Sequence, residues 1–163
     1  MSRLLYRLAW WFAVVGGLFA SAVAVMTVLS IAMRATVSRP IQGDVELTQF
    51  GIAMCISLCL PWCQLHGSNI IVDFFTQRAS ATVTRRLDAV GGLLLALMVL
   101  LLAWRTAAGA LAVGGAGETS MILALPMWWV YSALAPGLAL AGVIALHQAV
   151  VRLSGRDPVQ ELA

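Results

Sequence analysis

Charged residues are scarce in this chain, and lysine is absent. Of its 163 residues, 10% are charged and 61% are hydrophobic, against roughly 25% and about 45–50% in typical soluble domains. A chain this short cannot bury so many apolar side chains in one core, which excludes a soluble globular protein. The ten basic residues are all arginine, and they are scattered between long apolar runs rather than clustered. This dispersal argues against nucleic acid as a partner.

The chain also lacks the short apolar segment of a signal peptide. Arg3 and Arg7 precede a stretch that runs without charge from Leu8 to Met33, roughly twice the length of a signal h-region. A spanning helix needs about 20 mostly apolar residues, and four segments qualify. They cover approximately residues 8–33, 47–65, 87–113 and 126–151. Only short polar stretches separate them, so the sequence predicts a single all-α membrane domain over residues 1–163, a bundle of four transmembrane helices.

A short periodic segment follows the second span. Asn69 and Asp73 are polar residues four positions apart, and the apolar Ile70 and Phe74 have the same spacing. On a helix this spacing gives one polar face and one apolar face. We therefore expect a short interfacial amphipathic helix at about residues 68–78, lying flat on the cytoplasmic surface of the membrane. The alternative is an ordinary polar loop with accidental periodicity.

The placement of arginine predicts the orientation of the chain. Short cytoplasmic loops of membrane proteins carry the excess of positive charge. If both termini and the middle loop share one side, that side holds seven arginines and the other side holds three. We therefore expect both termini in the cytoplasm.

Aspartate, glutamate and arginine are missing from the middles of all four spans. Such residues usually mark ion or substrate paths through a membrane, and the lone Pro136–Gly137 step is more typical of a kink than of the paired broken helices of transporters. The spans therefore do not suit a stand-alone pump or secondary transporter. Arg105 lies near the predicted outer interface, where it can snorkel towards Glu118 or contact an acidic group of a partner.

Cysteine and histidine are also few. Cys55, Cys59 and Cys63 lie on one stripe of one helix, so they cannot converge on a zinc ion, and their small side chains instead favour close helix packing. His66 and His147 lie near the cytoplasmic ends of the second and fourth spans. That matched depth is what a b-type haem between helices requires. A haem redox protein is therefore one alternative, and two interface histidines that bond to water or lipid headgroups are another.

Small residues in the first span favour close packing. Ala13, Gly17 and Ser21 form a ladder with a spacing of four, which is typical of helix contacts within a bundle or with another subunit. No glycine-rich loop that could cradle phosphate occurs in the sequence, so we expect no ATP hydrolysis by this chain.

Two groups of motifs give the chain a family resemblance. The first is Gly43-Asp-Val-Glu46 at the start of the second span, followed by His66-Gly67-Ser-Asn69-Ile70-Ile-Val72-Asp73. The second is Glu118-Thr-Ser120, followed by Leu125-Pro126-x-Trp128 and Tyr131. In this order and on four spans, the motifs resemble the DctQ-like family, the small membrane subunit of tripartite ATP-independent periplasmic (TRAP) transporters. The family commonly has a histidine or another polar residue where this chain has Asn69.

The resemblance implies a scaffold or accessory subunit, not an enzyme, in the inner membrane of a bacterium. It implies a large multi-span partner that carries the substrate and sodium sites, and a periplasmic binding protein that delivers an organic acid. In this chain itself we expect no cofactor and no metal, only protein partners and membrane lipid. A freestanding membrane structural protein is the remaining alternative.

The resemblance and the predicted topology together give six candidate contact residues. Those expected at the outer face are Glu46, Arg105 and Glu118, and those in the inner motif are Gly67, Asn69 and Asp73. For Asp73, a contact that fixes the interfacial helix or the partner and a merely solvated carboxylate are equally good interpretations.

Overall fold

The computed structural model describes residues 2–38, 41–67 and 81–154, and helices dominate it. The helices are α1 (Ser2–Val37), α2 (Asp44–Leu65), α3 (Ala81–Ala116) and α4 (Trp128–Leu153). Each of them is long and apolar enough to cross a membrane. The predicted all-α membrane fold with four spans is therefore confirmed. The segment expected to form the interfacial helix lies outside the described residues.

The helices extend beyond the apolar segments that the sequence marks. α1 and α3 have 36 residues each, which at 1.5 Å per residue gives a length of about 54 Å. The hydrocarbon core of a bilayer is only about 30 Å thick. Hydropathy marks the part of a helix that suits lipid, whereas the backbone hydrogen bonds continue through the polar ends, and this accounts for the difference.

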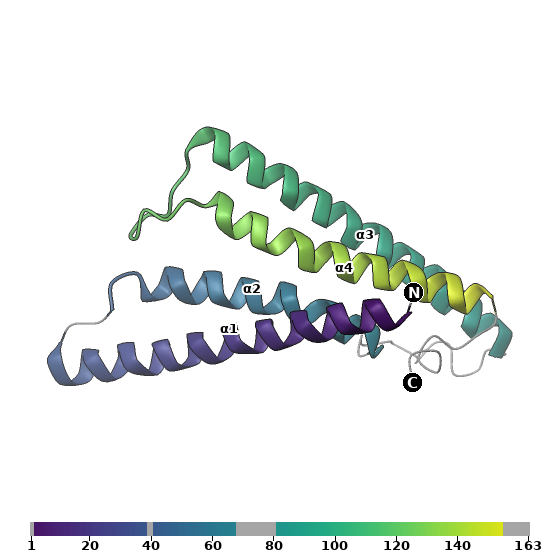
Figure 1. Ribbon diagram of the computed structural model, residues 1–163, viewed down its shortest axis with the longest axis horizontal. Coiled ribbons are helices and arrows are strands. Elements are labelled where there is room, and N and C mark those ends of the chain that lie inside the picture. Colours follow the sequence, from purple (N-terminus) through teal and green to yellow (C-terminus); the bar gives the residue numbers. More distant parts are fainter. Residues whose placement is uncertain (1, 39–40, 68–80, 155–163) are drawn as a thin grey trace.

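The helices form two antiparallel hairpins, α1–α2 and α3–α4, which are joined through α2 and α4 (Figure 1). The order across the molecule is therefore α1, α2, α4, α3. Within the described residues α3 contacts neither α1 nor α2, and α1 meets α4 only slightly. The bundle is thus a row of helices, in which α1 and α3 are the two edges and α2 and α4 form the centre.

The hairpins pack most closely toward the end of the molecule where α1 begins and α4 ends (Figure 1). There Ala9, Leu65 and Ile144 form a small buried core. Gln64 and Gln148 add polar contacts beside it. Gln64 Nε2 donates to Gln148 Oε1 at 2.9 Å, and Gln148 Nε2 donates to the backbone oxygen of Gln64 at 2.9 Å. These bonds fasten the C-terminal turn of α2 to α4.

α2 and α4 also cross closely near the middle of their lengths. Pro61 has no backbone N–H, so the carbonyl of Ser57 lacks its usual donor within α2. That carbonyl lies against Gly137 of α4, where a Cβ atom would overlap with it. The Ser57 hydroxyl donates to the carbonyl of Leu134 at 2.7 Å. Proline, serine and glycine together allow the two backbones to touch at this point, which we call the α2–α4 crossing.

Candidate partner-contact site

The α3–α4 loop (residues 117–127) reaches across to the start of α2, where Glu46 holds it. Glu46 Oε2 accepts hydrogen bonds from the Ser120 hydroxyl at 2.8 Å and from the Leu123 backbone N–H at 3.1 Å. Glu46 Oε1 accepts one from the Ile122 backbone N–H at 2.8 Å. One half-buried carboxylate therefore joins the second hairpin to the first.

The loop has a compact shape of its own. Thr119 and Pro126 form an antiparallel bridge, and the backbone N–H of Ser120 donates to the carbonyl of Leu125 at 2.9 Å. The Ser120 hydroxyl also accepts from the Leu125 N–H at 3.2 Å. Ser120 thus bonds to Leu125 within the loop and to Glu46 of α2 at the same time. Ala124 completes the turn with a positive φ of 52°.

The start of α2 is shaped to receive this loop. Gly43 has a φ of 74°, in the left-handed region, and the side chain of Leu123 packs directly on it. A Cβ atom at Gly43 would lie 2.5 Å from Leu123 Cγ. The next residue, Asp44, accepts from the hydroxyl of the buried Ser30 at 2.6 Å and lies 3.7 Å from Arg34 of α1. These contacts fix the end of α1, the start of α2 and the loop relative to one another.

The two motifs that the sequence analysis singled out therefore meet in space, with Leu123 between the two runs of the second motif. Gly43 and Glu46 belong to the first motif, and Ser120 belongs to the second, 74 positions from Glu46. Sequence reasoning named Glu46 as an outer-face contact but did not pair it with Ser120 or Leu123. No periodicity could have paired them, because a contact between residues so far apart depends on how the hairpins pack.

The other predicted site residues lie apart from Glu46. Arg105 of α3 and Glu118 at the start of the loop are both exposed, and in the described part of the chain no ion pair joins them. Gly67 follows the end of α2 with a φ of 62°, and no described residue lies within 4 Å of a Cβ atom built on it. Asn69 and Asp73 lie outside the described residues.

The tip of the α3–α4 loop is apolar and faces outward. Met121 is 100% exposed and Ile122 is 61% exposed, although the backbone of Ile122 is held by Glu46. Large apolar side chains at the surface of a protein commonly mark a contact with another protein or with lipid.

Comparison with protein families identifies the chain. The family model "Tripartite ATP-independent periplasmic transporters, DctQ component" matches residues 23–155, which include both motifs and the whole α3–α4 loop. The chain belongs to the DctQ family. It is thus a small component of a TRAP transporter, which works in a complex with a large component and a binding protein. Searches of curated proteins and of solved structures gave no match.

The histidines and cysteines of this DctQ-family chain make local contacts. The Nδ1 atom of His66 lies 3.0 Å from the carbonyl oxygen of Trp62, and the two rings are 4.3 Å apart between centroids. No hydrogen bond or ring contact joins His66 to His147 in the described ranges. Cys59 packs against Gly16 of α1, where a Cβ atom would lie 2.8 Å from its sulfur. In the part of the chain that the structure describes, no three histidine, cysteine or acidic residues gather as metal ligands would.

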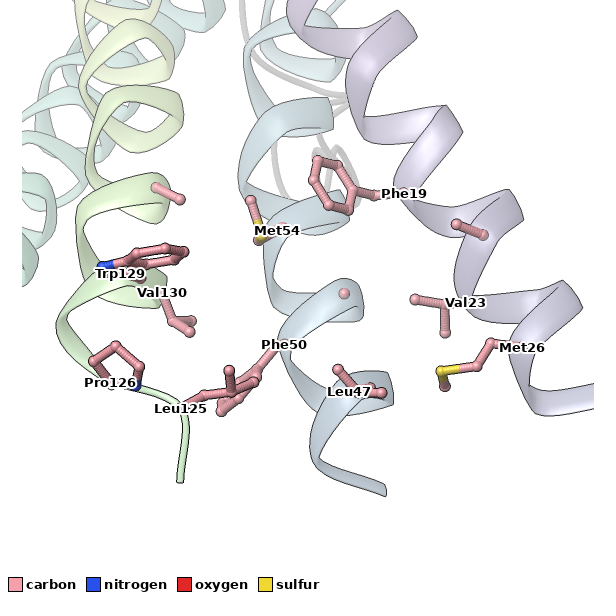
Figure 2. Close-up of a pocket in the computed structure, with 13 residues that line it drawn as sticks. Phe19, Val23, Met26, Leu47, Phe50, Met54, Leu125, Pro126, Trp129 and Val130 are labelled. Atoms are coloured by element: carbon pink, nitrogen blue, oxygen red, sulfur yellow. The ribbon is translucent and has the colours of Figure 1, made fainter. Parts of the chain in front are cut away.

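A lateral groove opens between α1 and α4, with α2 as its floor (Figure 2). Its volume is about 500 Å³. The side chains of Phe19 and Val23 reach it from α1, those of Trp129 and Val130 reach it from α4, and Phe50 lies on α2 (Figure 2). The full lining consists of Phe19, Ala22, Val23, Met26, Leu47, Phe50, Gly51, Met54, Leu125, Pro126, Trp129, Val130 and Ala133. This DctQ-family chain thus has an apolar groove just inside its loop end.

Proposed function

We propose that this DctQ-family chain is a scaffold subunit that braces the large multi-span subunit of a TRAP transporter in the inner membrane of a bacterium. The complex imports an organic acid that a periplasmic binding protein delivers, and the sodium gradient drives the import. The sodium and substrate sites belong to the large subunit. Both termini of this chain lie in the cytoplasm, and the α3–α4 loop faces the periplasm.

The observation that carries this proposal is how the chain uses its polar side chains within the membrane. Among the described residues, the buried polar side chains in the spans are Ser30, Ser57 and Gln148. Ser30 donates a hydrogen bond from α1 to Asp44 of α2, and Ser57 and Gln148 donate hydrogen bonds between α2 and α4. Polar groups along a transport path must be able to exchange water or a ligand. Here they fasten one helix to another, which is what a static brace requires.

The edges of the helix row provide surfaces for the large subunit. α1 and α3 each pack against only one principal neighbour in the described part of the chain, so their outer faces are apolar and exposed. On α1, Gly17 and Ser21 are exposed, while the adjacent Gly16 is the glycine that meets α2. Small exposed residues let a helix from another subunit approach closely.

Charged and apolar groups at the loop end support a second contact area. Glu118 is exposed there, and Arg105 is exposed on α3 eleven residues before that helix ends, so each of them can pair with a charge of a partner. Glu46 acts through the α3–α4 loop, because it fixes the backbone beneath the exposed Met121 and Ile122. We place the contact of the charged residues and the contact of the loop tip on the periplasmic side of the complex.

The first experiment is to tag the chain, extract it from its native membranes in mild detergent and identify the proteins that copurify. We expect a colourless preparation with a many-span partner in roughly stoichiometric amount. A chain that purifies alone with a Soret absorbance band would replace the proposal with a haem protein held by His66 and His147. A colourless chain that purifies alone, even after cross-linking in the membrane, would favour a freestanding structural protein.

Sodium coupling needs a second experiment. The copurified complex is reconstituted in vesicles with its binding protein, and uptake of radiolabelled organic acids is measured with and without an inward sodium gradient. We expect uptake only with the gradient. Uptake that persists in sodium-free buffer contradicts sodium coupling but leaves the scaffold role intact.

The inner motif remains a candidate contact area. Gly67, Asn69 and Asp73 follow α2 in the sequence, on the side that we assign to the cytoplasm. We expect Asp73→Ala to lower the recovery of the large subunit or the transport rate. Wild-type values of both would remove Asp73 from the contact residues.

A further inference from the structure

The lateral groove is closed at its inner end, away from the α3–α4 loop. On α2 its floor runs from Leu47 to Met54, a length of about 10 Å at 1.5 Å per residue. Beyond Met54 the α2–α4 crossing closes it, because Ser57 and Gly137 touch there. A transmembrane helix of a partner needs a groove through the full hydrocarbon thickness of about 30 Å. The groove is too short for a helix to lie along it, whereas the end of a flexible hydrocarbon chain can enter it.

The lining of the groove fits hydrocarbon. All thirteen lining residues are apolar or glycine, so no side-chain carboxylate, hydroxyl or amide is present to bind a polar ligand. The volume of about 500 Å³ lies in the range of about 300–1,000 Å³ that is typical of ligand pockets. Because α3 contacts neither α1 nor α2 in the described residues, no other described helix covers the open side of the groove.

A positive charge lies on α1 beyond the loop end of the groove. Arg34 is eight residues beyond Met26 on α1, a rise of about 12 Å toward the membrane surface. Its side chain is 64% exposed and lies 3.7 Å from Asp44. A guanidinium has five N–H donors in a planar fork, and the partial contact with Asp44 leaves most of them accessible. Phosphate oxygens are well suited to such donors.

We propose that the lateral groove binds one acyl chain of a glycerophospholipid whose phosphate is held by Arg34. The chain end lies on Phe50 and Met54, and the headgroup lies at the surface between α1 and α2. The lipid fills the space where the two hairpins diverge. The proposal concerns this chain as a membrane protein, and it does not depend on the transported substrate or on the scaffold role.

A photo-reactive lipid tests the proposal directly. The purified tagged chain, with whatever partner copurifies, is placed in vesicles of phosphatidylethanolamine and phosphatidylglycerol. These vesicles contain phosphatidylethanolamine that carries a diazirine near the end of one acyl chain. After irradiation, mass spectrometry locates the lipid adducts. We expect adducts on Phe50 and Met54, whose side chains are half-buried on the floor of the groove.

Two variants separate a specific site from bulk lipid. Ala133→Phe fills the groove from α4, and we expect it to remove most adducts on Phe50 and Met54. Ala20→Phe adds the same ring on the exposed face of α1 outside the groove and is expected to leave them unchanged. If Ala133→Phe does not fold, Ala22→Phe fills the groove from α1 instead. Arg34→Gln is expected to lower adduct formation about fivefold at limiting lipid.

Two results would overturn the proposal. An absence of adducts on Phe50 and Met54 in the purified assembly would show that protein, not lipid, occupies the groove. Adducts that are equally abundant in wild type, Ala133→Phe and Arg34→Gln would show that only bulk lipid reaches these residues.

Discussion

Glu46 is the residue whose role the tertiary structure changed most. From the sequence it is an acid at the start of a span, available to a partner at the outer face. In the structure its two oxygens accept three hydrogen bonds from the α3–α4 loop. A carboxylate has about four acceptor sites, so its main bonds are already within the chain. Its contribution to a partner contact is therefore the position of the loop.

Removal of this carboxylate should weaken the fold. We expect Glu46→Ala to lower the free energy of unfolding of the purified chain by about 1–3 kcal/mol, because it leaves loop donors without an acceptor. Thermal unfolding in detergent, followed by tryptophan fluorescence, measures the change. Glu118→Ala is the matched control, since it removes an exposed carboxylate that makes no side-chain hydrogen bond in the described residues. Equal stability of the two variants would contradict the role of Glu46.

Gly43 is the second residue that the packing requires. Its φ of 74° is unfavourable for a residue with a Cβ atom, and that atom would also meet Leu123. We expect Gly43→Ala to cost about 1–2 kcal/mol from the backbone alone. Gly17→Ala is the control, because nothing lies within 4 Å of a Cβ atom there. The shift in the unfolding midpoint measures the effect. A Gly43→Ala variant that is as stable as Gly17→Ala would show that the α3–α4 loop moves aside at no cost in free energy.

At the scale of elements, the α2–α4 crossing joins the two hairpins. The hydrophobic effect does not drive helices together in lipid, so close backbone contact and hydrogen bonds between helices become important. The crossing supplies both, through Gly137 and through the Ser57 hydroxyl. The bonds between Gln64 and Gln148 supply a second attachment nearer the end of the molecule.

A methyl group at the crossing should push the hairpins apart. We expect Gly137→Ala to destabilise the chain by about 1–3 kcal/mol, the usual cost of overpacking a close contact. Gly91→Ala in α3 is the control, because its Cβ atom would lie in open space. Denaturant unfolding in detergent measures the free energy of unfolding of the two variants. If the Gly137→Ala and Gly91→Ala variants have the same free energy of unfolding, the backbones of α2 and α4 are not in contact at the crossing.

The polar contacts between α2 and α4 offer a separate prediction. Gln148 is 4% exposed and bonds to Gln64 and to the carbonyl of Leu65. We expect Gln148→Leu to lower stability by about 1 kcal/mol, in line with other hydrogen bonds between helices in membranes. Combined with Gly137→Ala, the two losses should add, because the sites are about three helical turns apart on α4. A strongly non-additive result would indicate that the hairpins shift as one unit.

At the scale of the whole molecule, the row of helices leaves two long apolar edges. In a closed four-helix bundle every helix packs against two neighbours, whereas in the described part of this chain α1 and α3 each pack mainly against one. The exposed apolar area suits lipid everywhere and suits a second membrane subunit at one edge. The family to which the chain belongs provides such a partner.

The orientation of the molecule can be tested with single cysteines. In a chain freed of Cys55, Cys59 and Cys63, a cysteine replaces either Met121 in the loop or Ser154 after α4. We expect an impermeant maleimide to label Met121→Cys in intact spheroplasts and to label Ser154→Cys only after the membrane is opened. The reverse pattern would show that the seven arginines face the periplasm.

Local pattern was enough to predict most of the fold. Uncharged stretches such as Leu8 to Met33 can satisfy their backbone in lipid only as helices, so hydropathy alone located all four spans. The family resemblance followed from short motifs, each of which spans only one or two helical turns. The limits of α1 and α3 were underestimated, because these helices continue through polar residues at which the hydropathy has already fallen.

The sequence by itself thus determined that the chain is an all-α membrane protein with four spans and that it belongs among DctQ-like subunits. The tertiary structure decided which residues meet. It paired Glu46 with Ser120, set Gly137 against Ser57 and opened a groove between α1 and α4. The reason is physical: insertion depends on the composition of each segment taken alone, whereas the contacts between segments depend on packing geometry that no single segment contains.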